Sequence, residues 1–152
     1  MYVGQWEDNE KSGIGQQKYV NVGDYYGYWE AGKRHGEGVM TYTNLDVYSG
    51  NWVGGQKAGK GTYIVYKTGE KYVGDFKNGQ LVRGKWIYPN GSYFEGKFNQ
   101  NKPKGAGSWH FANGNVVCGD YTQTKRADVE GDVVKLAWKT TSDITKSPAV
   151  SN

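Results

Sequence analysis

The residue types that most often carry out catalysis are few in this sequence, and they stand far apart. There are two histidines and one cysteine. We expect His35, in a polar stretch, to be surrounded by solvent and His110 to lie on the polar side of a strand. Cys118 has no histidine near it in the sequence, whereas a nucleophilic thiol needs an adjacent base. The sequence therefore predicts no catalytic residue and a protein that is not an enzyme.

Metal and cofactor sites are not indicated either. Metal ions are held by clusters of histidine, cysteine or carboxylate ligands. The carboxylates of this chain are instead scattered through polar stretches, for example Glu7, Asp8, Glu30, Glu70, Asp75 and Glu95. We predict that the protein binds no metal and no cofactor.

A repeated Gly-x-Gly motif raises the possibility of a phosphate-binding loop. It occurs at Gly13-Gly15, Gly36-Gly38, Gly59-Gly61 and Gly105-Gly107, with only Gly84 left in a fourth, shorter copy. A nucleotide loop must lead into the N-terminus of a helix, but residues typical of strands follow these glycines. We interpret the glycines as positions of close backbone approach and unusual φ.

A second motif, aromatic-x-Gly-x-aromatic, recurs in phase with the first and reveals a repeat. Its copies begin at residues 2, 25, 48, 72, 94 and 117, so consecutive units are 22 to 24 residues apart. The sixth copy is degenerate. We expect the motif residues to hold the repeat together, namely Tyr2, Gly4, Trp6, Tyr25, Gly27, Trp29, Tyr48, Gly50, Tyr72, Gly74, Phe76 and Gly96.

Each unit reads as a β-hairpin. The motif residues alternate with polar ones, which is the period of a half-buried strand, and the missing glycine side chains leave space for neighbouring rings. Turn residues separate the units, for example Pro89-Asn90-Gly91 and Asn113-Gly114. We expect the connection within each unit, such as residues 30–35, to be longer and polar. The prediction is an all-β fold, an elongated single antiparallel sheet made of a meander of hairpins, with no sizeable helix.

Composition agrees with a thin sheet rather than a thick closed core. The chain has 24 Gly, 13 Tyr and 6 Trp, but a hydrophobic fraction of only 36% and a mean hydropathy of −0.82. Disordered chains are poor in aromatic residues, so the rings argue for order. The net charge of +4 is modest and contains no basic block, so we predict no nucleic-acid partner. A lone cysteine favours a reducing compartment, and no segment is apolar enough to span a membrane.

Two regions are expected. Residues 1–121 form the repeat array, with five full units and the degenerate sixth, and residues 122–152 form a C-terminal cap and polar tail. Val134, Leu136 and Trp138 alternate once more and predict a terminal strand. The stretch 140–152 is rich in Ser and Thr and cannot form a core alone, so we expect a neighbouring molecule to hold it.

The pattern Tyr-x-Gly-x-Trp-x-x-Gly-x-x-x-Gly-x-Gly over residues 2–121 resembles the MORN repeat. Within it, the run from Tyr25 to Tyr121 resembles the MORN arrays of radial spoke head subunits of motile cilia. The matching details are Arg34-His35-Gly36-Glu37-Gly38, residues 67–74, Asn78-Gly79-Gln80 and Asn101-Lys102-Pro103. The chain lacks the long acidic tail that such proteins often carry. This resemblance implies a structural scaffold of the cytoskeleton, in the axoneme of a cilium or flagellum.

The aromatic side of the sheet is the predicted binding surface. Domains bury apolar faces against a second layer, and no helix is expected here to provide one. We therefore expect part of this face to bind protein partners, with other radial spoke head subunits and a second copy of the chain as candidates. The predicted anchors are Tyr42, Trp52, Tyr63, Trp86, Tyr88, Phe98 and Trp109.

A membrane-associated MORN protein that binds acidic phospholipids is the alternative. In that case the basic residues of the later repeats would contact the lipid, namely Lys97, Lys102, Lys104, Lys125 and Arg126. These residues are spread over different strands and loops, and neither end of the sequence has a lipidation signal. Membrane binding is therefore the less favoured of the two interpretations.

Overall fold

The protein is a single antiparallel β-sheet. The structure, a computed structural model, describes residues 1–128 and 131–146, and this part contains strands and no helix, so no helix in it could cross a membrane. The prediction of an all-β fold is confirmed. The strands are β1 (Tyr2–Glu7), β2 (Glu10–Tyr19), β3 (Gly23–Glu30), β4 (Lys33–Tyr42), β5 (Val47–Val53), β6 (Gln56–Ile64), β7 (Lys71–Lys77), β8 (Gln80–Ile87), β9 (Tyr93–Asn99), β10 (Lys102–His110), β11 (Asn115–Asp128), β12 (Gly131–Thr140) and β13 (Thr145–Lys146).

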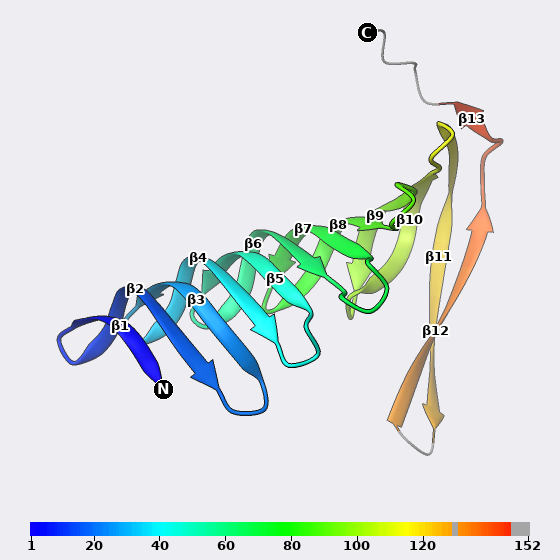
Figure 1. Ribbon diagram of the computed structural model, residues 1–152. Helices are drawn as coiled ribbons and strands as arrows, with labels where there is room; N and C mark the ends of the chain where they lie inside the picture. The colour runs from blue at the N-terminus through cyan, green and yellow to red at the C-terminus, as the bar shows by residue number, and fades with distance from the viewer. Residues whose placement is uncertain (129–130, 147–152) are drawn as a thin grey trace, which may run out of the picture.

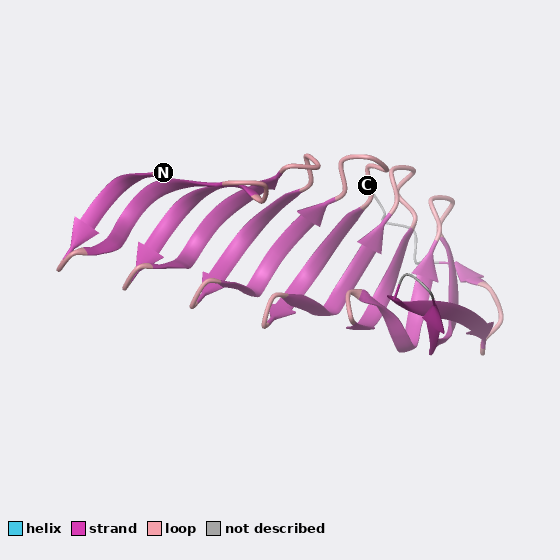
Figure 2. Cartoon of the chain, turned by 90° about the horizontal axis from the view of Figure 1, so that it is seen from below, coloured by secondary structure: helices cyan, strands magenta, loops and turns pink. Residues whose placement is uncertain are grey.

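The strands follow one another across the sheet in the order of the chain. From β1 to β12 each strand pairs with the next, and the short β13 pairs with β11. Figure 1 shows the hairpins succeeding one another along one axis, and Figure 2 shows their strands side by side in one layer. Each hairpin therefore contacts only its neighbours, as in other repeat proteins, and the predicted meander is confirmed.

The connections within the hairpins are much tighter than the sequence suggested. Two residues join β3 to β4, and both Ala31 and Gly32 have positive φ, at 48° and 77°. Gly54-Gly55 and Asn78-Gly79 repeat this geometry, which is that of the type I′ turn that suits twisted hairpins. The expectation of a longer connection over residues 30–35 was wrong. Most of the polar residues there belong to the ends of β3 and β4, where Glu30 pairs with Lys33 in the ladder.

The connections between hairpins fall at the predicted turn residues. In three of them an asparagine side chain accepts a hydrogen bond from the backbone N–H two residues later, which fixes the turn. The acceptors are Asn44 (3.0 Å to the Asp46 nitrogen), Asn90 (2.9 Å to Ser92) and Asn113 (2.9 Å to Asn115).

A continuous row of glycines crosses the sheet at right angles to the strands. Every strand from β1 to β11 contributes one glycine, and each pairs in register with the glycine of the next strand. Thr140 of β12 pairs with the last of them and ends the row. The members are Gly4, Gly15, Gly27, Gly38, Gly50, Gly61, Gly74, Gly84, Gly96, Gly107 and Gly119.

A bulge beside this row bends each of the first five hairpins. In the second hairpin, Gly27 and Trp29 pair with Gly38 and Arg34, so the second strand is longer than the first by two residues. The extra stretch contains Gly36, with φ of 75°. In the fourth hairpin the pairs Gly74 with Gly84 and Phe76 with Leu81 leave only one extra residue. This smaller bulge explains why the fourth Gly-x-Gly copy is one residue short.

The C-terminal strands close the array. β11 runs without a break to Asp128, and β12 pairs along it, so the predicted terminal strand with Val134, Leu136 and Trp138 is confirmed. Figure 1 shows this last hairpin extending past the margin of the others.

The segment after β12 is held by the chain itself. The Thr141 nitrogen donates to the Cys118 oxygen at 2.9 Å, the Cys118 nitrogen donates to Ser142 Oγ at 3.1 Å, and β13 pairs with the start of β11. The expectation that a neighbouring molecule holds the tail was therefore wrong for residues 140–146. Residues 147–152 lie outside the described residues.

Candidate functional site

The first ring of each motif lies over the glycine row. A side chain added at Gly38 would meet the Tyr25 ring, and one added at Gly61 would meet the Tyr48 ring. Tyr25 and Tyr48 are fully buried, and their hydroxyls donate to backbone oxygens at 2.8 and 2.9 Å. Gly38 and Gly61 of the Gly-x-Gly motif thus make room for the rings, whereas a Cβ at Gly27 of the aromatic motif would first meet the backbone of the paired strand.

The second ring of the motif locks adjacent repeats together. Trp52 packs edge to face between Tyr48 and Tyr25, with ring centroids 5.1 and 5.3 Å away. Its indole Nε1 donates to the Gly38 oxygen at 3.2 Å, and Trp29 makes the same bond to Gly15 at 3.0 Å. The rings therefore form a core within a single layer, although a second layer seemed necessary from the sequence.

The aromatic side is the inside of the bent sheet. Lys57 lies near the turn of its hairpin and Tyr63 near the other end of the same strand, yet the Lys57 ammonium is 5.1 Å from the Tyr63 ring centroid. Lys11 Nζ likewise reaches the Gln17 amide oxygen at 2.8 Å. The two ends of the strands thus approach each other over the rings, and we call this concave side the aromatic groove.

Three cations line the groove at equivalent positions of the first three hairpins. Lys11 lies 5.0 Å from the Trp29 ring, Arg34 4.6 Å from Trp52, and Lys57 5.1 Å from Tyr63. Arg34 also donates to the Gly55 oxygen at 2.6 Å. We had assigned these residues to polar connections. Their recurrence one residue after the start of β2, β4 and β6 was the signal that sequence reasoning missed.

Charged groups of both signs lie in this region, because the Tyr63 hydroxyl donates to the Asp46 carboxylate at 2.7 Å. Burial, and then the nearby Arg34 guanidinium, lower the pKa of Lys57. Among the described residues the ion pairs are His35 with Glu30 (2.9 Å) and Lys60 with Asp75 (2.7 Å), and neither involves the three groove cations. Cations that rest on rings without a carboxylate partner can attract an anionic group of a ligand.

A pocket of about 280 Å³ opens beside Lys57. It is lined by Lys57, Tyr63, Tyr72, Phe76, Leu81 and Asn101. Leu81 takes the place that the cations occupy in earlier hairpins, and its backbone nitrogen donates to Asn101 Oδ1 at 2.9 Å. The pocket therefore combines the apolar side chains of Phe76 and Leu81 with the Lys57 ammonium, the Asn101 amide and two tyrosines.

The predicted anchor residues divide into two sets. Trp52 and Phe98 are only 3% and 6% exposed, so their rings are part of the core and are not available to a partner, contrary to our expectation. Trp86, Tyr88 and Trp109 are half-buried and meet at centroid distances of 5.0 to 5.8 Å, and we call them the Trp86 cluster. Tyr42 and Tyr63 are also half-buried. An interface role for these five stays a prediction.

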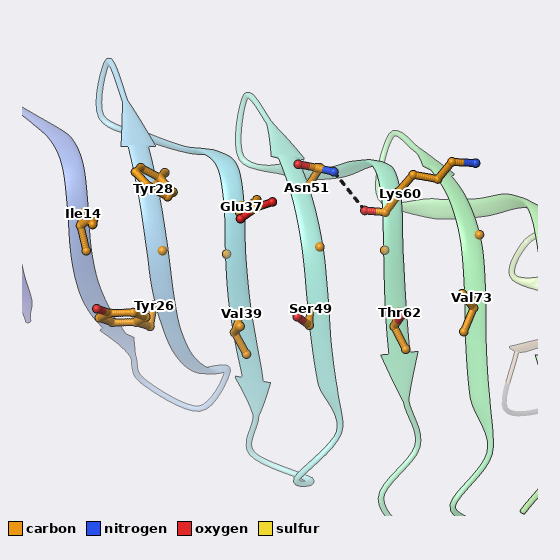
Figure 3. Close-up of a pocket in the computed structure, with 15 residues that line it drawn as sticks. Ile14, Tyr26, Tyr28, Glu37, Val39, Ser49, Asn51, Lys60, Thr62 and Val73 are labelled. Atoms are coloured by element: carbon orange, nitrogen blue, oxygen red, sulfur yellow. Dashed lines mark hydrogen bonds between the residues drawn. The ribbon is translucent and has the colours of Figure 1, made fainter.

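The opposite face carries an outer trough of about 720 Å³ along the glycine row. Figure 3 shows two rows of side chains flanking the glycines, one with Tyr28, Glu37 and Asn51 and the other with Tyr26 and Val39. Tyr26 is 60% exposed. We expected this face to be polar and did not predict its two tyrosines, Tyr26 and Tyr28. Their positions on either side of Gly27 in the sequence were the signal for them.

The residues considered for catalysis are kept apart by the fold. The His110 ring stacks on Tyr93 at 4.5 Å and bonds to Ser108 at 2.9 Å, whereas His35 pairs with Glu30 at the hairpin turn. Cys118 is exposed. Within residues 1–128 and 131–146, no three potential metal ligands gather.

Replacing Arg34 by alanine should lower the free energy of unfolding by about 1–3 kcal/mol, because the groove loses ring contacts and the bond to Gly55. Arg83→Ala is the matched control, since Arg83 is exposed on the other side of the sheet, and should change stability by less than about 0.5 kcal/mol. Urea denaturation followed by circular dichroism measures both. Equal losses would contradict the structural role of Arg34.

Comparison with known proteins supports the repeat. The profile of the MORN repeat matches residues 2–21, 25–47, 48–64, 72–93 and 94–116, while a search of curated proteins finds no match. The degenerate sixth copy lies beyond the matched residues, although Gly119 continues the glycine row. The MORN family is a non-enzymatic repeat family with roles in protein or membrane interaction. The five matched units cover most of the chain, which belongs to the MORN repeat family.

Proposed function

We propose that this protein is a non-catalytic scaffold of the radial spoke head in motile cilia or flagella, where it docks other spoke-head subunits through the aromatic groove. The observation that carries the proposal is the Trp86 cluster, three large rings that meet in the groove and stay partly exposed. Large aromatic side chains of this kind are the usual anchors of protein interfaces.

The groove is also rigid, which favours docking. Backbone bonds join the turns of successive hairpins: Gly32 to the Lys11 oxygen, Gly55 to Arg34 and Gly79 to Lys57, each at 3.0 Å. At the end of the array the Gln123 amide nitrogen, which has two hydrogens to donate, lies 3.0 Å from the oxygens of Asn99, Lys102 and Pro103. Binding of a partner therefore costs little conformational entropy, because this surface is already ordered.

Some of the details that resemble spoke-head arrays lie in the groove or line its pocket. Arg34 lies on the groove rings, Asn101 lines the pocket, and the smaller fourth bulge sets the position of Leu81 beside it. The smaller fourth bulge departs from the other repeats, whereas Arg34 stands at the position of Lys11 and Lys57. We favour a docking site as the reason for this departure.

Axoneme fractionation tests the proposal. The tagged chain, expressed in ciliated cells, should stay with detergent-extracted axonemes and be released in the same salt fraction as spoke-head subunits. Complete release with the membrane and soluble fraction would contradict it.

The membrane alternative receives less support. Of its five basic residues, the structure describes the side chains of four, all exposed: Lys97, Lys102, Lys104 and Lys125. By strand alternation Lys97, next to Gly96, faces outward, whereas Lys125 has the parity of Tyr121 and faces the groove side. These four do not form one basic surface. Co-sedimentation with anionic vesicles distinguishes the alternative, and strong binding that Lys97→Ala weakens would favour it.

A further inference from the structure

Strand β1 presents an unpaired edge with a defined set of free hydrogen-bonding groups. Met1 and Lys18 exchange both backbone bonds, at 3.0 and 3.2 Å. Because alternate residues of an antiparallel strand bond to opposite sides, Val3 also faces β2, whereas the N–H and C=O of Gly4 and Trp6 point to the free edge. Such an edge is a template for another strand.

Trp6 lacks two contacts that its equivalents make. Trp29 packs between Tyr25 and Tyr2 at 5.1 and 5.2 Å and donates to the Gly15 oxygen at 3.0 Å. Trp6 has only its own Tyr2, at 5.1 Å, and is 59% exposed, against 4% for Trp29. Trp6 therefore lacks a second ring neighbour. It also lacks a glycine carbonyl opposite Gly4 on the free edge of β1.

Strand β1 carries both missing pieces itself. We propose that β1 pairs antiparallel with β1 of a second copy, with Gly4 opposite Gly4, so that the glycine row continues through a two-fold axis. In this register Tyr2 of one copy lies opposite Trp6 of the other. The Trp6 indole can then donate to the Gly4 oxygen of the second copy, as Trp29 donates to Gly15.

A second copy supplies these groups better than another of the described strands of the same chain. Strands β2 to β11 are paired along both edges, so none is free to cover β1. At the other end, Thr140 stands in place of glycine, so the row does not continue head to tail. A two-fold contact uses the same patch twice and closes at two copies. This dimer is independent of groove docking, because it uses the edge of β1.

Sedimentation velocity over a concentration series tests the dimer. A short edge buries little area, so we expect a dissociation constant in the micromolar range. Trp6→Ala should raise it at least tenfold, on the order of 1.4 kcal/mol or more. Val3→Ala is the matched control, because Val3 is 62% exposed on the opposite face of the same strand, and it should leave the constant unchanged.

Disulfide trapping tests the register. In a Cys118→Ser background, one preparation carries Val3→Cys and another carries Gln5→Cys. These positions would be opposite each other in a non-hydrogen-bonded pair, about 4.5 Å apart at Cα, within disulfide reach. Mixing the two should give a covalent dimer, and each alone should not. The circular dichroism spectrum of each variant shows whether it is folded.

Three results would overturn the proposal. The first is a wild-type protein that stays monomeric at the highest concentration. The second is equal weakening by Trp6→Ala and Val3→Ala. The third is a dimer that the mixed cysteine variants fail to trap.

Discussion

Replacing Gly27 by alanine should lower the free energy of unfolding by about 3–5 kcal/mol, a large part of the stability of an ordinary domain. The new Cβ would lie 2.4 Å from the Gly38 Cα and 2.6 Å from the Glu37 oxygen. Both are backbone atoms of the paired strand, which cannot move without breaking the ladder. The glycine row is therefore required by packing between strands, and the effect is one of overpacking.

Gly91→Ala is the control for this substitution. Nothing lies within 4 Å of the Cβ it would add, but its φ is +91°. It tests backbone strain without crowding, for which we expect about 1 kcal/mol. Urea titration of both variants gives the comparison. A loss for Gly27→Ala no larger than that for Gly91→Ala would show that crowding at the row does not matter.

Alkaline pH should unfold the protein cooperatively between pH 10 and 12. Burial is the leading cause of a raised pKa at nine tyrosines, and it brings the pKa of Tyr48 and of Tyr72 from 10.0 to about 12. The others with a raised pKa are Tyr2, Tyr19, Tyr25, Tyr42, Tyr63, Tyr88 and Tyr121.

The sign follows from proton linkage. A folded state whose tyrosines have a raised pKa keeps its protons above pH 10, where the unfolded chain loses them. The stabilisation is full below pH 10 and is lost as pH rises through the folded pKa. For the fully buried Tyr48, a shift from 10.0 to about 12 corresponds to about 3 kcal/mol. Lys57, with its lowered pKa, adds a smaller effect of opposite sign just below pH 10.5.

Tyrosinate absorbance and circular dichroism, recorded together against pH, measure this transition. We expect most phenolate to appear in the same narrow interval in which the sheet signal is lost. Smooth ionisation centred on pH 10 with the sheet intact would contradict the burial of the rings.

The periodic residues allowed most of the fold to be predicted. Tyr25, Gly27 and Trp29 mark one face of a strand because their spacing matches its period, and the units in phase imply neighbouring hairpins. Turn length was harder to predict, because polar residues such as Lys33 occur both in loops and at the exposed ends of strands. A bulge at Gly36 then places Arg34 where its charge meets rings of three other strands.

The binding surface was harder to predict than the fold. Trp52 and Trp86 occupy aromatic positions of similar appearance, yet one is a core residue and the other is half-exposed. The difference arises from ring packing between repeats. Two tyrosines, Tyr48 and Tyr25, pack edge to face on Trp52 and cover it. Trp86 lies against Tyr72, Tyr88 and Trp109 and is still partly exposed. Such three-dimensional neighbours cannot be read from the repeat alone.

Capture of spoke-head subunits from ciliated cells by immobilised protein tests the central claim most directly. The wild-type protein is compared with the double variant Trp86→Ala, Trp109→Ala and with Tyr26→Ala, which removes an exposed ring from the outer trough. Circular dichroism first establishes that each is folded. The groove account predicts that wild type and Tyr26→Ala retain the subunits and that the double variant loses at least about nine-tenths of them, as expected for hot-spot anchors. Equal retention by a folded double variant, or no spoke-head subunit on the wild type, would contradict it.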